Sequence, residues 1–182
     1  ISPEQMQSLL NPRSIAVIGA STNIRKNGGR LFRYLAEYGY PGKLYPIHPQ
    51  AEVVQGHQAY PRLKDVPGEV DLACIIVEAK KVPDAMRECR EKGVKSAIIF
   101  SAGFAETGEE GLALQKEILR IAEEGNIRFV GPNSVGIASP GHRVHAAFAN
   151  VFEMEEKIPG QIAFVSQSGA IGGILLGRAW EQ

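Results

Sequence analysis

Short apolar runs alternate with segments of mixed polarity along most of the sequence. Short runs this apolar are typical of strands whose two faces are both buried, as in a parallel sheet. Six runs are predicted to be strands: 14–18, 43–47, 72–77, 96–100, 127–130 and 162–165.

Helical periodicity fills the intervals between these runs. Apolar residues recur there at the three- and four-residue spacing that puts them on one face of a helix. The predicted faces are Leu31, Leu35 and Tyr38, then Val82, Ala85, Met86 and Cys89, then Leu114, Ile118, Ile121 and Ala122. A short helix over 3–10 is expected before the first strand. The alternation predicts an α/β fold with a Rossmann-like, doubly wound parallel sheet.

The pattern changes after residue 140. Residues 1–140 are predicted to form the first domain, and residues 141–160, with two histidines and an acidic cluster, are expected to be a linker. Residues 161–182 offer one strand and one helix, which is too little to bury a core. We expect them to begin a second α/β domain that continues past Gln182. The start at Ile1 rather than Met is expected of a chain that is either processed or excised from something longer.

Composition excludes several classes of protein. Lys plus Arg and Asp plus Glu balance at 20 each, so no basic surface for nucleic acid is expected. No apolar run reaches the roughly 18–20 residues of a membrane span, and no signal peptide is visible, which predicts a cytoplasmic protein. Cys74 and Cys89 occupy apolar positions and are expected to be buried free thiols. No Cys/His cluster has the spacing of metal ligands.

The loop after the first strand contains residue types that are typical of a phosphate-binding loop. It leads to Gly28-Gly29 and then to a helix, whose first turn offers unpaired N–H groups and a partial positive charge. The loop adds a flexible glycine, two hydroxyls and two cations: Gly19, Ser21, Thr22, Arg25 and Lys26. The alternative is a tight strand-to-helix turn that binds no ligand.

The end of the second strand argues against a dinucleotide. NAD-binding domains usually place an acidic residue there to bind the ribose hydroxyl. The sequence here is His48-Pro49-Gln50, without an acid, and only the first glycine of the G-x-G-x-x-G pattern is in place.

Eight stretches carry a resemblance to a known family. They are 11–21, 39–49, 56 with 59–61, 70–73, 91–94, 101–104, 131–133 with 136, and 165–169. Together, and in this order, they resemble the CoA-binding domain of NDP-forming acyl-CoA synthetases, relatives of the succinyl-CoA synthetase α subunit.

The resemblance implies a reaction and its cofactors. Enzymes of this family interconvert an acyl-CoA, ADP and phosphate with the free acid, coenzyme A and ATP, through an acyl phosphate and a phosphohistidine. The histidine belongs to a second, flavodoxin-like domain, so it is expected beyond Gln182 and no catalytic residue is expected in this chain. ATP or ADP and Mg would be bound by an ATP-grasp domain or subunit. Homo-oligomer formation stays open.

The resemblance also implies which residues bind coenzyme A. The phosphates would be held by the loop after the first strand, with Gly19, Ala20, Ser21, Thr22, Arg25 and Lys26. The adenosine side would be lined by His48 and Pro49. Two strand-end loops would run along the cofactor, formed by Val77, Glu78 and Ala79 and by Ser101, Ala102 and Gly103, and its thiol end would lie near Asn133. The loop of Ser166, Ser168 and Gly169 would receive the phosphate of the phosphohistidine. The alternative for its serines is an ordinary helix N-cap.

Three positions depart from the family pattern. The family usually has Asn-Pro-Lys where this chain has His48-Pro49-Gln50, so a lysine contact to phosphate is absent. Glu78 stands where proline is usual, and its carboxylate would repel an anionic cofactor. Ser134 stands where cysteine is frequent.

Two other functions compete with a ligase. One is a CoA-binding regulatory module fused to a protein acyltransferase, which the sequence beyond Gln182 would reveal. The other is an NAD(P)-binding oxidoreductase or redox sensor. The remaining histidines, His57, His142 and His145, are expected to be exposed loop residues without a catalytic role.

Overall fold

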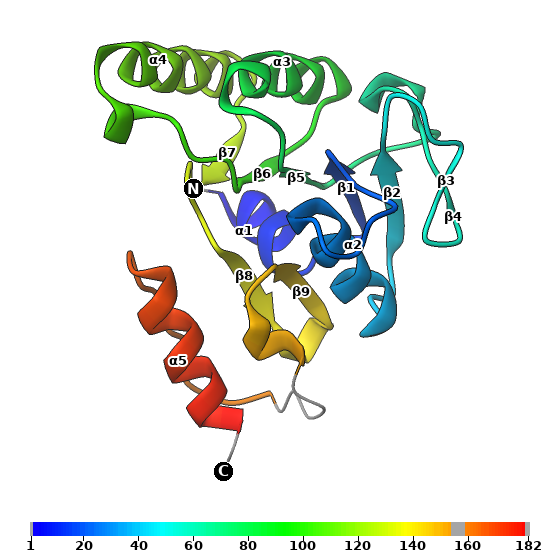
Figure 1. Ribbon diagram of the computed structural model, residues 1–182, viewed down its shortest axis with the longest axis vertical. Coiled ribbons are helices and arrows are strands. Elements are labelled where there is room, and N and C mark those ends of the chain that lie inside the picture. The colour runs from blue at the N-terminus through cyan, green and yellow to red at the C-terminus, as the bar shows by residue number, and fades with distance from the viewer. Residues whose placement is uncertain (1, 154–158, 181–182) are drawn as a thin grey trace.

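The fold is built on one parallel sheet. A computed structural model describes residues 2–153 and 159–180 of the chain (Figure 1). The five strands of the sheet follow the spatial order β2-β1-β5-β6-β7 and all pair in parallel. Their bounds are β1 Ser14–Ile18, β2 Lys43–Ile47, β5 Leu72–Ile75, β6 Ser96–Ile99 and β7 Arg128–Val130. The predicted α/β class and its parallel sheet are thereby confirmed.

Helices cover both faces of this sheet. Helices α3 (Val82–Lys92) and α4 (Glu109–Glu124) lie side by side on one face, and α1 (Pro3–Leu10) and α2 (Asn27–Glu37) lie on the other (Figure 1). Alternate residues of β1 show the consequence: Ala16 packs with the α3 and α4 core, whereas Ile15 and Val17 pack with α2. All three are fully buried, which explains why the strands read as continuous apolar runs.

Two short hairpins were not predicted. The first consists of β3 (Val53–Val54) and β4 (His57–Gln58). The second consists of β8 (Gly136–Ser139) and β9 (Val144–Ala147), and β9 lies inside the stretch expected to be a linker. Every residue of β9 is buried, and Val144 and Ala146 pack in the α2 core. This part of the expected linker therefore belongs to the folded domain.

The hairpins also change the expectation for two histidines. His145 is 3% exposed, and its ring meets the Tyr38 ring edge to face at 5.6 Å, so the expectation of a solvated loop residue was wrong. Alternation along β9 puts Val144 and Ala146 in the α2 core and His145 and Ala147 on the opposite face. That face is covered as well, because His145 meets Tyr38 and Ala147 packs with Tyr34 and Trp180. His57 is half-buried against Phe32. His142 is exposed as expected.

The sixth predicted strand is absent. Residues 161–168 form no strand, and Ile162 and Val165 are 93% and 96% exposed. A strand needs a neighbour for its backbone hydrogen bonds, and none of the described strands pairs with this segment. The helix after it is present as α5 (Gly169–Trp180), whose Trp180 is buried beside Tyr34.

An ion pair joins the amino ends of β1 and β5. The Asp71 carboxylate accepts the Arg13 backbone N–H at 2.8 Å and its Nε–H and Nη2–H at 3.1 Å each. The Asp71 side chain is only 13% exposed. Hydrogen bonding by the Arg13 side chain, more than any other contact, lowers the pKa of the Asp71 carboxyl.

We expect Asp71→Asn to destabilise the fold at neutral pH by about 1 kcal/mol, because a charged acceptor of three hydrogen bonds becomes neutral. A carboxyl whose pKa is lowered by folding stabilises the folded state fully above its unfolded pKa of about 4, and this contribution is lost as pH falls from that value through the lower pKa of the folded state. The difference from wild type should therefore shrink between pH 7 and pH 3 in urea unfolding. Glu69→Gln is the control, since Glu69 is 87% exposed and meets Arg13 only at 3.5 Å. A difference that stays constant with pH would contradict the role of the charge.

Candidate functional site

The candidate site lies at the carboxyl edge of the sheet. From β1 the chain moves outward to β2 and then crosses back to β5 on the other side of β1. The order of the strands thus reverses at β1, and ligands of doubly wound sheets bind in the crevice at such a point. The predicted cofactor residues all follow strands at this edge, so the fold collects them from five separate parts of the sequence.

The first loop crosses the end of β5 at very short range. Gly19 has φ +93°, and a Cβ atom there would lie 2.4 Å from the Ile76 carbonyl oxygen. A Cβ atom on Gly28 would lie 2.1 Å from the Gly19 carbonyl oxygen. Both distances are shorter than any real contact of a Cβ atom, so this path of the backbone requires glycine at both positions.

Two side chains that the sequence analysis overlooked hold the first loop in place. The Asn23 Oδ1 accepts the Arg25 N–H at 2.9 Å, and the Asn23 N–H donates to the Ser21 Oγ at 3.1 Å. Gln55, in the turn of the β3–β4 hairpin, donates its amide to the carbonyls of Ser21 and Gly29 at 3.0 and 2.9 Å. The hairpin therefore clamps the loop against the start of α2.

The groups that could meet a phosphate are open on this loop. Thr22, Arg25 and Lys26 are exposed and Ser21 is half-buried. Lys26 is the N-cap residue of α2, and no side chain caps the helix there. The first turn of α2 therefore has no capping side chain, as at helix N-termini that bind anions, and two of its residues, Gly28 and Gly29, are buried.

His48 ends β2 with a fixed ring. Its Nδ1 accepts the backbone N–H of Gln50 at 3.2 Å and of Ala51 at 2.9 Å. With Nδ1 engaged by these two backbone amides, Nε2 is the ring nitrogen that can donate to a ligand. A hydrogen-bond donor thus stands where NAD-binding domains usually carry an acid.

The loops after β5, β6 and β7 are linked to one another. The Ser101 hydroxyl donates to the Val77 carbonyl at 2.5 Å, and the Asn133 N–H donates to the Ser101 carbonyl at 2.9 Å. A Cβ atom on Gly103 would lie 3.1 Å from that of Ala79. Residues 77–79, 101–103 and 133 therefore form one continuous edge, with Ala102 exposed on it.

The amide of Gly103 already has an acceptor. It donates to the Glu106 Oε1 at 2.7 Å. This hydrogen bond is the main cause that lowers the pKa of the Glu106 carboxyl. Gly103 can therefore flank a ligand, but its N–H is occupied by a carboxylate of the same loop.

A cavity of about 510 Å³ opens at the reversal of strand order. It is bounded by the ends of β1, β2 and β5 and by the first turns of α3. Six of the predicted cofactor residues line it: Gly19, Ala20, His48, Pro49, Val77 and Glu78. The Glu78 carboxylate, expected to repel an anion, lies 3.1 Å from the Lys81 ammonium.

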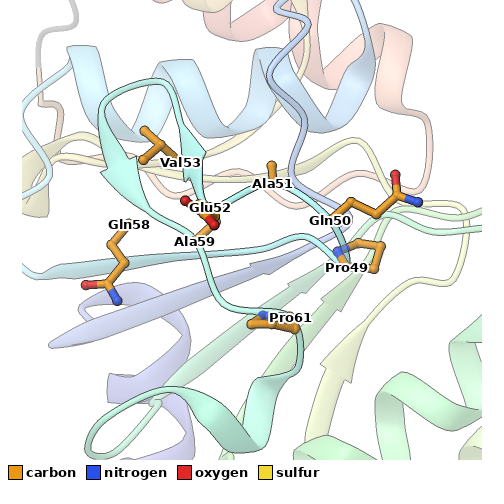
Figure 2. A pocket seen from close by; sticks show the side chains of 8 residues that line it. All are labelled: Pro49, Gln50, Ala51, Glu52, Val53, Gln58, Ala59 and Pro61. Carbon is orange, nitrogen blue, oxygen red and sulfur yellow. The ribbon is translucent and has the colours of Figure 1, made fainter.

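A second cavity of about 410 Å³ lies beside it, against the β3–β4 hairpin. Figure 2 shows Pro49 and Gln50 on the segment that follows β2, with Val53 and Gln58 on the two strands of the hairpin. Pro49 and Pro61 line both cavities. The two cavities are thus neighbours along the same edge.

The predicted phosphate loop lies near the far end of this edge. A Cβ atom on Gly169 would lie 2.0 Å from the Val135 Cγ2, so the start of α5 packs on the segment that follows Asn133. Within the loop, the Ser168 N–H donates to the Ser166 Oγ at 3.1 Å. The Ile171 N–H donates to the Ser168 Oγ at 3.4 Å, which is the geometry of a weak N-cap.

Both cysteines are buried free thiols, as the sequence predicted. Cys74 and Cys89 are free and fully buried, and burial raises the pKa of both thiols. Across residues 2–153 and 159–180, no three His, Cys, Asp or Glu side chains gather as metal ligands do. No helix in the same residues is long and apolar enough to cross a membrane.

Known proteins are similar to this chain in both sequence and fold. A family model described as a CoA binding domain matches residues 13–140. The α subunit of ADP-forming acetate–CoA ligase II from Pyrococcus furiosus is 48% identical over 162 residues, covering 89% of this chain and 34% of that subunit. ADP-forming acetate–CoA ligase II from Archaeoglobus fulgidus is 38% identical over 172 residues, covering 94% of this chain and 25% of that protein.

One solved structure of high similarity is a dinucleotide forming acetyl-coenzyme A synthetase 1 from Ca. Korarchaeum cryptofilum, in complex with phosphate and ADP. It matches with a TM-score of 0.88 and 38% identity, covering 98% of this chain and 37% of that one. The chain therefore spans between 25% and 37% of the length of these proteins.

We expect Gly28→Ala to destabilise the fold by about 1–3 kcal/mol, because the new methyl group meets a backbone carbonyl that cannot turn aside. Gly173→Ala is the matched control: Gly173 is also helical, in α5, and a Cβ atom there would meet nothing within 4 Å. That variant should keep or gain stability, by up to about 1 kcal/mol. Thermal unfolding of both variants measures the contrast, and equal stabilities would show that the first loop does not lie this close to α2.

Proposed function

This chain belongs to the CoA-binding domain family, and from that premise we propose that it is the CoA-binding part of an NDP-forming acid–CoA ligase. The complete enzyme would interconvert an acyl-CoA, ADP and phosphate with the acid, coenzyme A and ATP. The observation that carries the proposal is the cavity at the strand reversal, where six residues expected to bind coenzyme A meet.

The fit of coenzyme A rests on the order of the loops. Its pyrophosphate would lie on the first-turn amides of α2, with the hydroxyls of Ser21 and Thr22 and the cations Arg25 and Lys26 around it. Its nucleoside would enter the cavity beside His48 and Pro49. Because the loops of β5, β6 and β7 follow in spatial order, the pantetheine arm could extend along residues 77–79 and 101–103 toward Asn133.

The position of the predicted phosphate loop, which contains Ser166, Ser168 and Gly169, supports a role in phosphoryl transfer. Gly169 packs on the segment that follows Asn133, where the thiol of coenzyme A would end, and Ser166 and Ser168 precede it in the same loop. We infer that this loop receives the phosphate of a phosphohistidine. Backbone amides and neutral hydroxyls suit a phosphate that must leave again better than a fixed arginine would.

The remaining parts of the reaction are assigned to the rest of the protein. The histidine, the ATP-grasp domain or subunit, and the sites for ATP or ADP and Mg would lie outside these residues. An organic acid is the second substrate, and its identity is decided in those parts. We propose a cytoplasmic enzyme, with homo-oligomer formation left open.

The alternatives have less support from the site. His48 follows β2 where NAD-binding domains carry an acid, which disfavours an NAD(P)-dependent oxidoreductase. A regulatory CoA-binding module of an acyltransferase would use the same edge of the sheet, but the matches to two ligases cover 89% and 94% of this chain and so extend beyond residues 13–140.

We expect this chain to bind coenzyme A and not to form acyl-CoA from acid, ATP and coenzyme A, because the nucleotide site and the histidine are assigned elsewhere. Calorimetric titration with coenzyme A and with NAD should give at least about tenfold tighter binding of coenzyme A. Equal affinities would favour the oxidoreductase, and formation of acyl-CoA by this chain alone would refute the division of the reaction.

In the complete ligase we expect Ser168→Ala to slow phosphorylation of the histidine about tenfold, the cost of one hydroxyl donor, with unchanged affinity for coenzyme A. Ser168→Asp separates this role from N-capping, because aspartate caps a helix as well as serine but repels a phosphate. It should restore thermal stability and not phosphoryl transfer. Normal transfer in Ser168→Asp, or a loss of coenzyme A binding, would reverse the assignment.

A further inference from the structure

The wall of the larger cavity is not basic. Its ionisable lining side chains other than His48 are two cations, Arg62 and Lys81, and three anions, Glu78, Asp84 and Glu88. Residues 48–61, which follow β2, contain no lysine or arginine. A ligand rich in phosphate would therefore meet a net negative wall unless one of the two cations changed its partner.

Arg62 is firmly held. Its Nε and Nη2 lie 3.0 and 2.9 Å from the Glu88 Oε1. Glu88 also accepts the Leu63 N–H at 3.0 Å and is 22% exposed. Release of Arg62 would leave this half-buried carboxylate without its cation, which is costly.

Lys81 is weakly held. Its ammonium lies 3.1 Å from the Glu78 carboxylate, three residues earlier, and the two side chains are 66% and 77% exposed. Exposed pairs of this kind contribute little to stability. Of the two cations on the cavity wall, Lys81 is therefore the one that can exchange its partner at little cost.

The place of Lys81 indicates which phosphate it would meet. The cavity spans the end of β2 at His48 and the end of β5 at Val77 and Glu78. In doubly wound nucleotide-binding sheets the ribose lies at the end of the second strand, and a nearby cation accommodates a phosphate carried by that ribose. The ribose of coenzyme A carries such a group at its 3′ position.

We propose that Lys81 exchanges Glu78 for the ribose 3′-phosphate of coenzyme A, so that this ion pair makes the site selective for coenzyme A over dephospho-coenzyme A. The inference rests on the proposed function. The compact charge of an ammonium suits a terminal phosphate, and no bidentate geometry is required. Glu78 then lowers the affinity, because it competes for Lys81 and repels the phosphate.

The test is titration of this chain with coenzyme A and with dephospho-coenzyme A. Lys81→Gln should weaken coenzyme A about tenfold, the value of one charge-assisted hydrogen bond in a partly solvated site, and leave dephospho-coenzyme A unchanged. Glu78→Gln should tighten coenzyme A severalfold, and less so in the Lys81→Gln background. The salt dependence of coenzyme A binding should also decrease in Lys81→Gln.

Lys95→Gln is the matched control. Lys95 pairs with Glu4 at 3.7 Å, and the side chains are 50% and 73% exposed. It precedes β6 and so lies at the opposite edge of the sheet. The same loss of charge there should leave both affinities unchanged.

The outcomes separate the inference from its premise. If wild type binds neither ligand, the proposed function is wrong. If wild type prefers coenzyme A but Lys81→Gln weakens both ligands equally, or neither, then Lys81 does not bind the 3′-phosphate and the inference is wrong.

Discussion

Burial of both faces of the parallel sheet is the constraint on which the rest of the structure depends. Ile15 and Val17 face one layer of helices and Ala16 faces the other, all without exposure to solvent. A polar group on either face would lose its hydration without gaining a partner. Polar chemistry is therefore confined to the ends of the strands, and parallel pairing brings all five carboxyl ends to one edge.

That edge is continuous because each loop is tied to its neighbour through the backbone. Gly19 passes within contact of the Ile76 carbonyl, Ser101 bonds to Val77, and Asn133 bonds to Ser101. These links fix the loops before any ligand arrives, so a long ligand laid along the edge need not order them. Rigidity of this kind favours an extended cofactor over a compact one.

The sequence predicted the five paired strands because each is a short apolar run, and the three central strands β1, β5 and β6 are buried along almost their whole length. The run 162–165 has the same composition and is not a strand, because pairing depends on a neighbour that local sequence does not reveal. Strand β9 was not predicted, because four residues are too few for an alternating pattern to be recognised in the sequence. Asn23 and Gln55 were missed because they bind backbone atoms, and Gln55 does so across 26 or more residues. Residues with chemistry of their own, such as Ser21 and His48, could be found from sequence.

Net charge is a poor guide to this site for a physical reason. A chain with 20 cationic and 20 anionic side chains has no excess of positive charge that would indicate a polyanionic ligand. The amides at the start of α2 nevertheless carry a partial positive charge, which an amino-acid composition does not include. Such amides bind any phosphate, because backbone donors are alike. Discrimination between similar phosphate esters must then come from side chains whose charge is placed at one point. In a cavity whose wall carries two cations and three anions, a cation can supply that charge only by leaving a carboxylate. The weakest ion pair of the wall, Lys81 with Glu78, is therefore where selectivity can arise at the least cost in stability.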